Sequence, residues 1–114
     1  MRNGKGKEYD NKGTIIFEGE YLNGKRWKGK GKEYYDTGKL RYEAEYLNGK
    51  KWNVRGFDYN NNLIYELKDG KGKVLEYDEN CKLEFEGQYL DGERYGKGKE
   101  YNEFGYLIFE GEYL

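Results

Sequence analysis

The hexapeptide FEGEYL occupies residues 17–22 and recurs letter for letter at residues 109–114. Near-copies lie between them: YEAEYL at 42–47, the shortened YEL at 65–67, and FEGQYL at 85–90. Their leading aromatic residues follow one another by 25, 23, 20 and 24 residues. Self-similarity at a nearly fixed period is typical of repeat architectures. The sequence therefore predicts five copies of one unit, at about residues 4–28, 29–53, 54–69, 70–95 and 96–114.

Each copy has the pattern of two β-strands joined by turns. In the second copy, Leu40, Tyr42, Ala44 and Tyr46 alternate with other residues, and period two with aromatic residues is typical of a half-buried strand. Asn-Gly follows at residues 48–49, which is the strongest short hairpin signal. Helix signals are weak because no 3.6-residue apolar stripe persists. We therefore predict an all-β fold: one domain over residues 1–114, built as an elongated single-layer array of antiparallel β-hairpins.

The same alternation recurs in the other copies. A small residue stands two positions after the aromatic residue that opens the repeated stretch, and it is Gly19, Ala44, Gly87 or Gly111. Such a residue weakens a strand unless something packs close to it. We expect the aromatic ring of a neighbouring unit to cover this position.

The composition is unusual for an ordered domain. Leu, Ile, Val and Phe make up about 18% of the chain, within the range associated with disorder. The net charge is only −1, however, and 14 Tyr contribute to an aromatic content of 18%. A buried Tyr ring supplies much apolar area while its hydroxyl stays hydrated. We therefore expect an ordered protein with a thin, aromatic core.

The run YLNGKRWKGKGKEYYDTGKLRYEAEYLNGKK, residues 21–51, resembles the MORN repeat, whose pattern combines Tyr-x-Gly-x-aromatic, Asn-Gly-Lys and Gly-x-Gly. The resemblance covers nearly the whole chain and includes the bacterial variant described as an antitoxin component. It implies a β-hairpin repeat that acts as a binding or scaffolding module, with partners lying along an aromatic-lined groove. Where the family commonly has His after Asn-Gly-Lys-Arg, Trp27, Trp52 and Tyr95 stand near that place.

Catalysis is not expected from this sequence. The chain has neither His nor Ser, which excludes Ser-His-Asp and Cys-His arrangements and metal sites built from His and Cys. Its Gly-x-Gly pairs lead into strands, whereas a phosphate cradle needs a helix N-terminus. One carboxylate recurs in every copy, which indicates pairing with Lys and Arg of neighbouring strands. These residues are Glu18, Glu43, Glu66, Glu86 and Glu110. We expect no enzyme activity, cofactor or metal ion.

The leading functional expectation is a non-catalytic protein–protein interaction or scaffolding module. A one-layer sheet cannot bury all of its rings, and an exposed apolar patch rimmed by charge is typical of a binding site. The alternative is that the rings only stack on one another. The predicted partner-binding residues are Tyr9, Tyr34, Tyr59, Tyr77 and Tyr101, with Phe17, Tyr42, Tyr65, Phe85 and Phe109 nearby, and Trp27 and Trp52.

Two other functions remain open: an antitoxin-like regulator that binds a toxin, and a peripheral membrane module that binds phospholipid through basic turns. The 21 basic and 22 acidic residues are interspersed, so we expect no nucleic-acid binding. No apolar run approaches the length of a membrane span. The single cysteine, Cys81, fits a reducing, cytoplasmic location.

The ends of the array lead to one more expectation. Repeat arrays usually have atypical terminal units with a polar outer face, and the first and last strands here look like internal ones. Unpaired strand edges attract other strands. We therefore expect end-to-end or edge-to-edge self-association, or that the chain is a fragment of a longer array.

Overall fold

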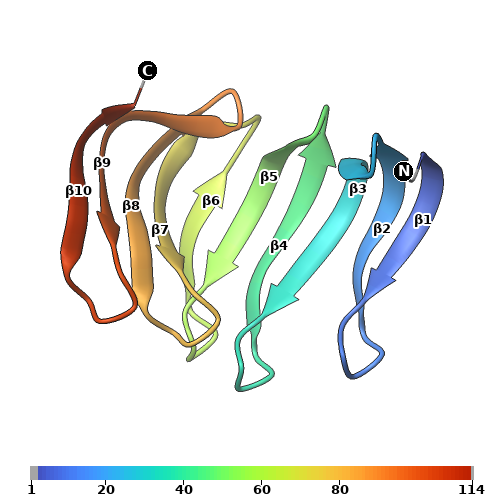
Figure 1. Cartoon of the computed structure of the whole chain (residues 1–114), viewed down its shortest axis with the longest axis horizontal. Helices are drawn as coiled ribbons and strands as arrows, with labels where there is room; N and C mark the ends of the chain where they lie inside the picture. Colours follow the sequence, from blue (N-terminus) through green and yellow to red (C-terminus); the bar gives the residue numbers. More distant parts are fainter. Residues whose placement is uncertain (1–2, 114) are drawn as a thin grey trace.

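The computed structural model describes residues 3–113, which form β-strands joined by turns. Neighbouring strands pair in antiparallel fashion and follow one another in chain order, with β1 and β10 at opposite ends (Figure 1). The strands are β1 (Gly4–Tyr9), β2 (Ile15–Leu22), β3 (Lys25–Tyr34), β4 (Leu40–Leu47), β5 (Lys50–Phe57), β6 (Leu63–Leu67), β7 (Gly72–Tyr77), β8 (Leu83–Leu90), β9 (Glu93–Tyr101) and β10 (Leu107–Tyr113). The predicted all-β fold of antiparallel hairpins is confirmed.

The strands form two sheets, so the expectation of one uninterrupted layer is wrong. β1 to β6 form a six-stranded sheet and β7 to β10 a four-stranded one, and the turn between them is closed by a bridge between Lys68 and Lys71. At Gly19 of β2, an added Cβ would lie 2.2 Å from the carbonyl oxygen of Lys28. Leu67 stands at the corresponding place in β6, opposite Val54 of β5. The backbones of β6 and β7 still lie close here, because an added Cβ at Gly72 would be 2.6 Å from the carbonyl oxygen of Glu66 and 3.1 Å from Cδ2 of Leu67.

The side chain of Leu67 packs in a core shared by the two sheets. It is 3% exposed and lies in one cluster with Ala44, Val54, Val74 and Phe85. Because this cluster draws residues from β4 to β8, burial of apolar area holds the two sheets together. With dimensions of 38 × 33 × 24 Å, the molecule is broad rather than strongly elongated.

The predicted alternation is interrupted at one point in each of the hairpins β1–β2, β3–β4, β5–β6 and β7–β8. Glu8 lies opposite Phe17, but the next residue, Tyr9, lies opposite Ile15, which leaves one residue of β2 over as a β-bulge. The same shift occurs in the pairs β3–β4, β5–β6 and β7–β8. Phe17 and Tyr21 are buried as expected, whereas Ile15 beyond the bulge is 40% exposed.

The small residues of the repeated stretch do not lie under a ring of a neighbouring unit. An added Cβ at Gly19 would meet the backbone of β3, 2.7 Å from the Cα of Gly29. At Gly87 the nearest atom, at 2.6 Å, belongs to the ring of Phe85 in the same strand. The backbone of the next strand and the ring two residues earlier therefore fill the space, and that part of the expectation is wrong.

The Asn-Gly and Asp-Gly turns stack on one another along one side of the molecule. Asn48 and Gly49 both have positive φ, 52° and 81°, as in the type I′ turn predicted for this dipeptide. The amide of Gly49 donates a hydrogen bond of 3.0 Å to the carbonyl of Trp27, and a ring carbon of Trp27 lies 3.3 Å from where a Cβ of Gly49 would be. The amide of Gly70 bonds Trp52 in the same way, at 2.6 Å.

The turns at the other strand ends are closed by side chains. The carboxylate of Asp10 accepts hydrogen bonds from the backbone amides of Lys12 and Thr14, at 2.8 and 3.0 Å. Equivalent turns form around Asp58, Asp78 and Asn102. In the second copy, Tyr35 takes this place; it is only 3% exposed and donates a hydrogen bond to the carbonyl of Phe57. The amide of the next residue, Asp36, bonds the carbonyl of Glu79 at 2.8 Å, which ties the first sheet to the second.

Candidate interaction surface

One face of the first sheet carries rows of alternating charge. Lys7 lies opposite Glu18, and Glu18 lies opposite Lys30. In the next row Glu43 lies opposite Arg55. The Lys7–Glu18 and Arg55–Glu43 pairs are 3.8 and 3.2 Å long. The predicted pairing of the repeated carboxylates with cations is confirmed for these strands, and opposite charges cancel along the rows.

These side chains border a shallow groove. It has a volume of about 1000 Å³ and runs over β2 to β6, where it is lined in part by Ile16, Lys32, Tyr34 and Arg55. A second groove of about 760 Å³ lies over the four-stranded sheet. Exposed ion pairs of this kind each contribute little to stability. On this charged face the carboxylates of Glu18 and Glu43 therefore already face a cation.

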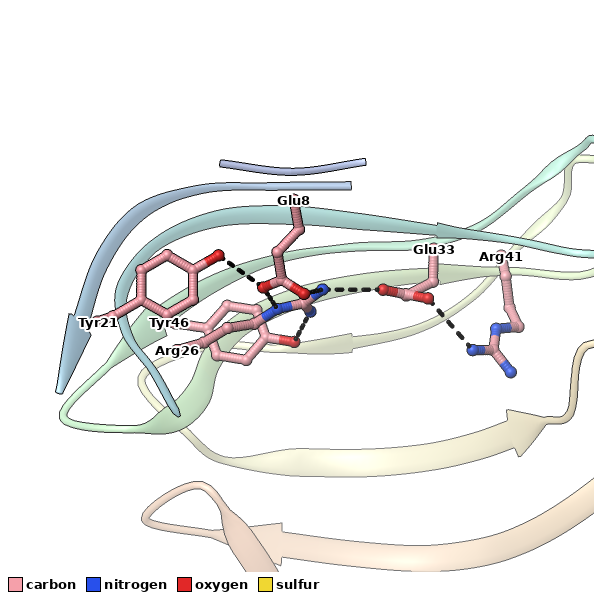
Figure 2. A network of polar contacts seen from close by, with 6 residues as sticks. All are labelled: Glu8, Tyr21, Arg26, Glu33, Arg41 and Tyr46. Atoms are coloured by element: carbon pink, nitrogen blue, oxygen red, sulfur yellow. Dashed lines mark hydrogen bonds and ion pairs between the residues drawn. The ribbon is translucent and has the colours of Figure 1, made fainter. Parts of the chain in front are cut away.

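The opposite face holds a network of polar contacts centred on Arg26 (Figure 2). The guanidinium donates from Nε to Oε2 of Glu8 at 2.7 Å and from Nη1 to the hydroxyl of Tyr46 at 3.0 Å. Its Nη2 also lies 3.4 Å from Glu33. The hydroxyl of Tyr21 donates to Glu8 at 2.8 Å. One arginine from β3 thus connects residues of four neighbouring strands.

Arg26 also covers the aromatic core of the first sheet. Its guanidinium lies 4.9 Å from the ring centroid of Phe17, which is completely buried and packs edge-on against Tyr21 and Tyr46 at 5.3 and 5.4 Å. Burial alone lowers the pKa of Arg26, but its hydrogen bonds to Glu8 and Tyr46 outweigh that and raise it. The guanidinium therefore stays charged while it stacks on the ring.

The four-stranded sheet repeats this cluster. Arg94 lies 3.9 Å from the ring centroid of Phe85 and 3.9 Å from a carboxylate oxygen of Glu76. The hydroxyl of Tyr89 donates to Glu76 at 2.7 Å, and burial together with this carboxylate raises the pKa of Tyr89. Tyr113 packs on Phe85 at 5.7 Å. The cluster is thus a repeated element of the fold, with its aromatic rings and charges directed at one another.

The structure separates the predicted partner-binding residues into groups. Phe17 and Phe85 are fully buried, and Tyr42 and Tyr65 pack against the core. Trp27 and Trp52 contact the next turn in the stack. On the other face, Tyr34 lines the charged groove, and the hydroxyl of Tyr101 bonds Glu86. Tyr77 is half-buried and Tyr9 is 56% exposed.

These residues therefore do not line one groove as a set, although Tyr42, Tyr65 and Tyr77 border one small cavity and Phe17 and Tyr34 both line the large groove. The reason is the pairing at the bulge: Glu8, rather than Tyr9, lies opposite Phe17. Successive residues of a strand point to opposite faces, so Tyr9, which follows this glutamate, points away from Phe17 and is 56% exposed. Tyr59 is not equivalent to Tyr9, because it lies in the turn after β5. The position equivalent to Tyr9 is occupied by Phe57, which lies opposite Leu63.

An exposed apolar patch lies at the β10 end of the molecule, and the sequence reasoning missed most of it. Among residues 3–113, β10 is hydrogen-bonded to β9 alone. Large side chains on this strand and on the turn before it are 41 to 73% exposed. We call these residues the β10 patch: Phe104, Tyr106, Leu107, Ile108 and Phe109. Their signal in the sequence is the run YLIF at 106–109, four apolar residues without alternation.

Phe109 lies on a strand whose outer edge is not covered by any other strand of residues 3–113. It opens the second FEGEYL and is 41% exposed, whereas Phe17, which opens the first, is 0% exposed. Ile108 is 61% exposed, whereas Ile16 in the same position of β2 is half-buried. A strand packed on both of its edges covers Phe17 and Ile16, so the exposure of Phe109 and Ile108 follows from the β10 edge that no other strand of residues 3–113 covers. Leu107, at 49%, is exposed much as Ile15 is in β2, at 40%.

Residues 3–113 include no helix that could cross a membrane. Comparison of the chain with family models, with curated proteins and with solved structures gives no match. The assignment of a function therefore depends on the arrangement of the chain's own residues.

Proposed function

We propose that the chain is a non-catalytic protein-interaction module, built as a MORN-like array of five hairpin units, that binds a partner through its β10 end. The observation that carries this proposal is the β10 patch, where five large apolar side chains border a strand edge. Exposed apolar side chains gathered on one strand and the turn before it are typical of protein-binding sites. An open edge adds a row of unpaired backbone N–H and C=O groups, which an incoming strand can use.

The recurring register supports the assignment of repeating units. Four of the units pair a glutamate near the end of one strand with the aromatic residue of the next: Glu8–Phe17, Glu33–Tyr42, Glu76–Phe85 and Glu100–Phe109. In the third unit Gly56 takes the place of the glutamate and lies opposite Tyr65. The ring of Tyr65 occupies the space that a side chain at Gly56 would need.

The ion pairs on the charged face support a non-catalytic role. Glu18 and Glu43 of the charged face lie in ion pairs with Lys7 and Arg55. Acid–base catalysis requires a carboxylate whose pKa is shifted for that task and that reaches the substrate. Carboxylates held against cations in repeated rows are suited to holding strands in register.

Photo-crosslinking at the patch tests this proposal. Tyr106, 70% exposed in the β10 patch, is replaced by p-benzoylphenylalanine, and the matched control carries the same replacement at Tyr59, 51% exposed and far along the chain. We expect a protein to be crosslinked from Tyr106 and not from Tyr59, and Ile108→Lys to reduce its binding in a direct titration. Equal crosslinking at both positions, or none from Tyr106, would overturn the proposal.

A further inference from the structure

We propose that the partner of the β10 edge is β1 of a second copy of this chain, paired in antiparallel fashion with Glu110 opposite Lys5. This inference rests on the proposed function, because it names the occupant of the same edge. It gives a head-to-tail contact in which two different edges of the molecule meet. The register is fixed by a pair of strands that the molecule already contains.

The two edges repeat the sequences of strands that pair inside the molecule. β10 contains FEGEY at residues 109–113, identical to residues 17–21 of β2. β1 reads GKGKEY over residues 4–9, identical to residues 29–34 of β3. β2 and β3 are neighbours in the first sheet. An open β10 edge and an open β1 edge therefore present the sequences of a strand pair that this fold already forms.

The observed pairing of β2 with β3 sets the register. Phe17 lies opposite Gly31, Glu18 opposite Lys30, and Gly19 opposite Gly29. Transferred to two copies, this register places Phe109 opposite Gly6, Glu110 opposite Lys5, and Gly111 opposite Gly4 of the second copy. The glycines matter, because at Gly29 an added Cβ would lie 2.4 Å from the carbonyl oxygen of Glu18.

Both edges have the space and the charges that this pairing needs. At Gly4 no atom of the described residues, apart from its chain neighbours, lies within 4 Å of where a Cβ would be, so within residues 3–113 the place that β2 takes beside Gly29 is open beside Gly4. Glu110 already faces Lys99 of β9 at 3.8 Å. Lys5 of the second copy, on the other side of Glu110, would complete the order Lys–Glu–Lys that Lys7, Glu18 and Lys30 show in the first sheet.

Burial favours the same contact. A strand beside β10 would cover Phe109 and Ile108 as β3 covers Phe17 and Ile16, and that removes apolar area from water. Because the two edges differ, each copy keeps one free edge after pairing. Contacts of this heterologous kind generate open chains of copies or closed rings, rather than a two-fold dimer.

Charge reversal with mutual rescue tests the register. Glu110→Lys alone sets a new lysine against Lys5, and Lys5→Glu alone sets a new glutamate against Glu110, so each variant should associate about tenfold more weakly than the natural chain. In an equal mixture, the new lysine of one variant can face the new glutamate of the other, and the natural pair forms at the alternate contacts. We expect the mixture to recover the association of the natural chain.

Sedimentation velocity over a concentration series measures the association. Glu45→Lys supplies the matched control, because it reverses a charge on β4, away from both edges, and should leave association unchanged. Circular dichroism and urea unfolding of each variant show whether it is folded. If Glu110→Lys and Lys5→Glu both unfold, Ile108→Lys takes their place and should also abolish association.

Three results would overturn the inference: a natural chain that stays monomeric, single variants that associate normally, or a mixture that shows no recovery. A closed dimer that ignores the Lys5→Glu change would also overturn it. If the chain stays monomeric while Tyr106 crosslinks a different protein, the proposed function stands and only this inference fails. If Tyr106 crosslinks a second copy alone, both stand.

Discussion

Replacing Phe17 by alanine should destabilise the protein more than replacing Phe109, although both residues open the same hexapeptide. Phe17 is 0% exposed and lies between two neighbouring strands, whereas Phe109 is 41% exposed on an edge. Removing a fully buried Phe typically costs about 3–5 kcal/mol, including the cavity it leaves. Scaled by the buried fraction of its side chain, Phe109→Ala should cost about 2–3 kcal/mol.

Urea unfolding followed by tryptophan fluorescence would measure this difference. A domain of this size has a total stability of about 5–15 kcal/mol, so Phe17→Ala removes a large share of it. Phe85→Ala is the control, because Phe85 is also 0% exposed and should lose as much as Phe17. The measurements belong at low protein concentration, where the copies are separate. Equal losses for Phe17→Ala and Phe109→Ala would refute the reasoning that a missing neighbour leaves Phe109 uncovered.

Three further changes test the fold. Gly19→Ala should lower the free energy of unfolding in urea by about 1–3 kcal/mol, because the new methyl would lie 2.2 Å from the Lys28 carbonyl oxygen; an unchanged midpoint would contradict this close approach. Arg26→Met should lower stability by about 1–3 kcal/mol in thermal unfolding, since it removes the hydrogen bonds that Glu8 accepts, and Arg26→Lys should restore only part of the loss. Stability should fall between about pH 10 and pH 12, because burial raises the pKa of Tyr35 to about 12, while an unfolded tyrosine titrates near 10 and so loses its proton first. Tyr35→Phe should make this decline shallower, and an unchanged pH profile of the variant would speak against the assignment.

The hairpins could be predicted because their signals are local. Alternation over Leu40 to Tyr46 and the Asn48-Gly49 turn depend on residues close in sequence, and both are present in β4 and the turn that follows it. The ion pair between Glu43 and Arg55 follows from the same period. Local pattern thus determines the strand, its turn and the residue it pairs with.

The face on which each side chain lies and the division into two sheets could not be predicted from the local alternation of residues. One leftover residue in β2 sets Glu8 opposite Phe17, and this placed Tyr9 on the other face from the one expected. The split into two sheets after β6 has no counterpart in the local pattern, because Leu67 continues the alternation of Leu63 and Tyr65. The exposure of Phe109 and Ile108 depends on which strand edge residues 3–113 leave uncovered, a property of the whole array.

The stacking of strands in chain order has a mechanical consequence. The strands run crosswise to the line from β1 to β10 (Figure 1), and hydrogen bonds between antiparallel strands are perpendicular to the strands. Tension applied between β1 and β10 therefore acts along these bonds and separates one strand from its neighbour at a time, as in unzipping. Because each unit contacts mainly its neighbours, the molecule should lengthen in small steps at low force, one strand at each step.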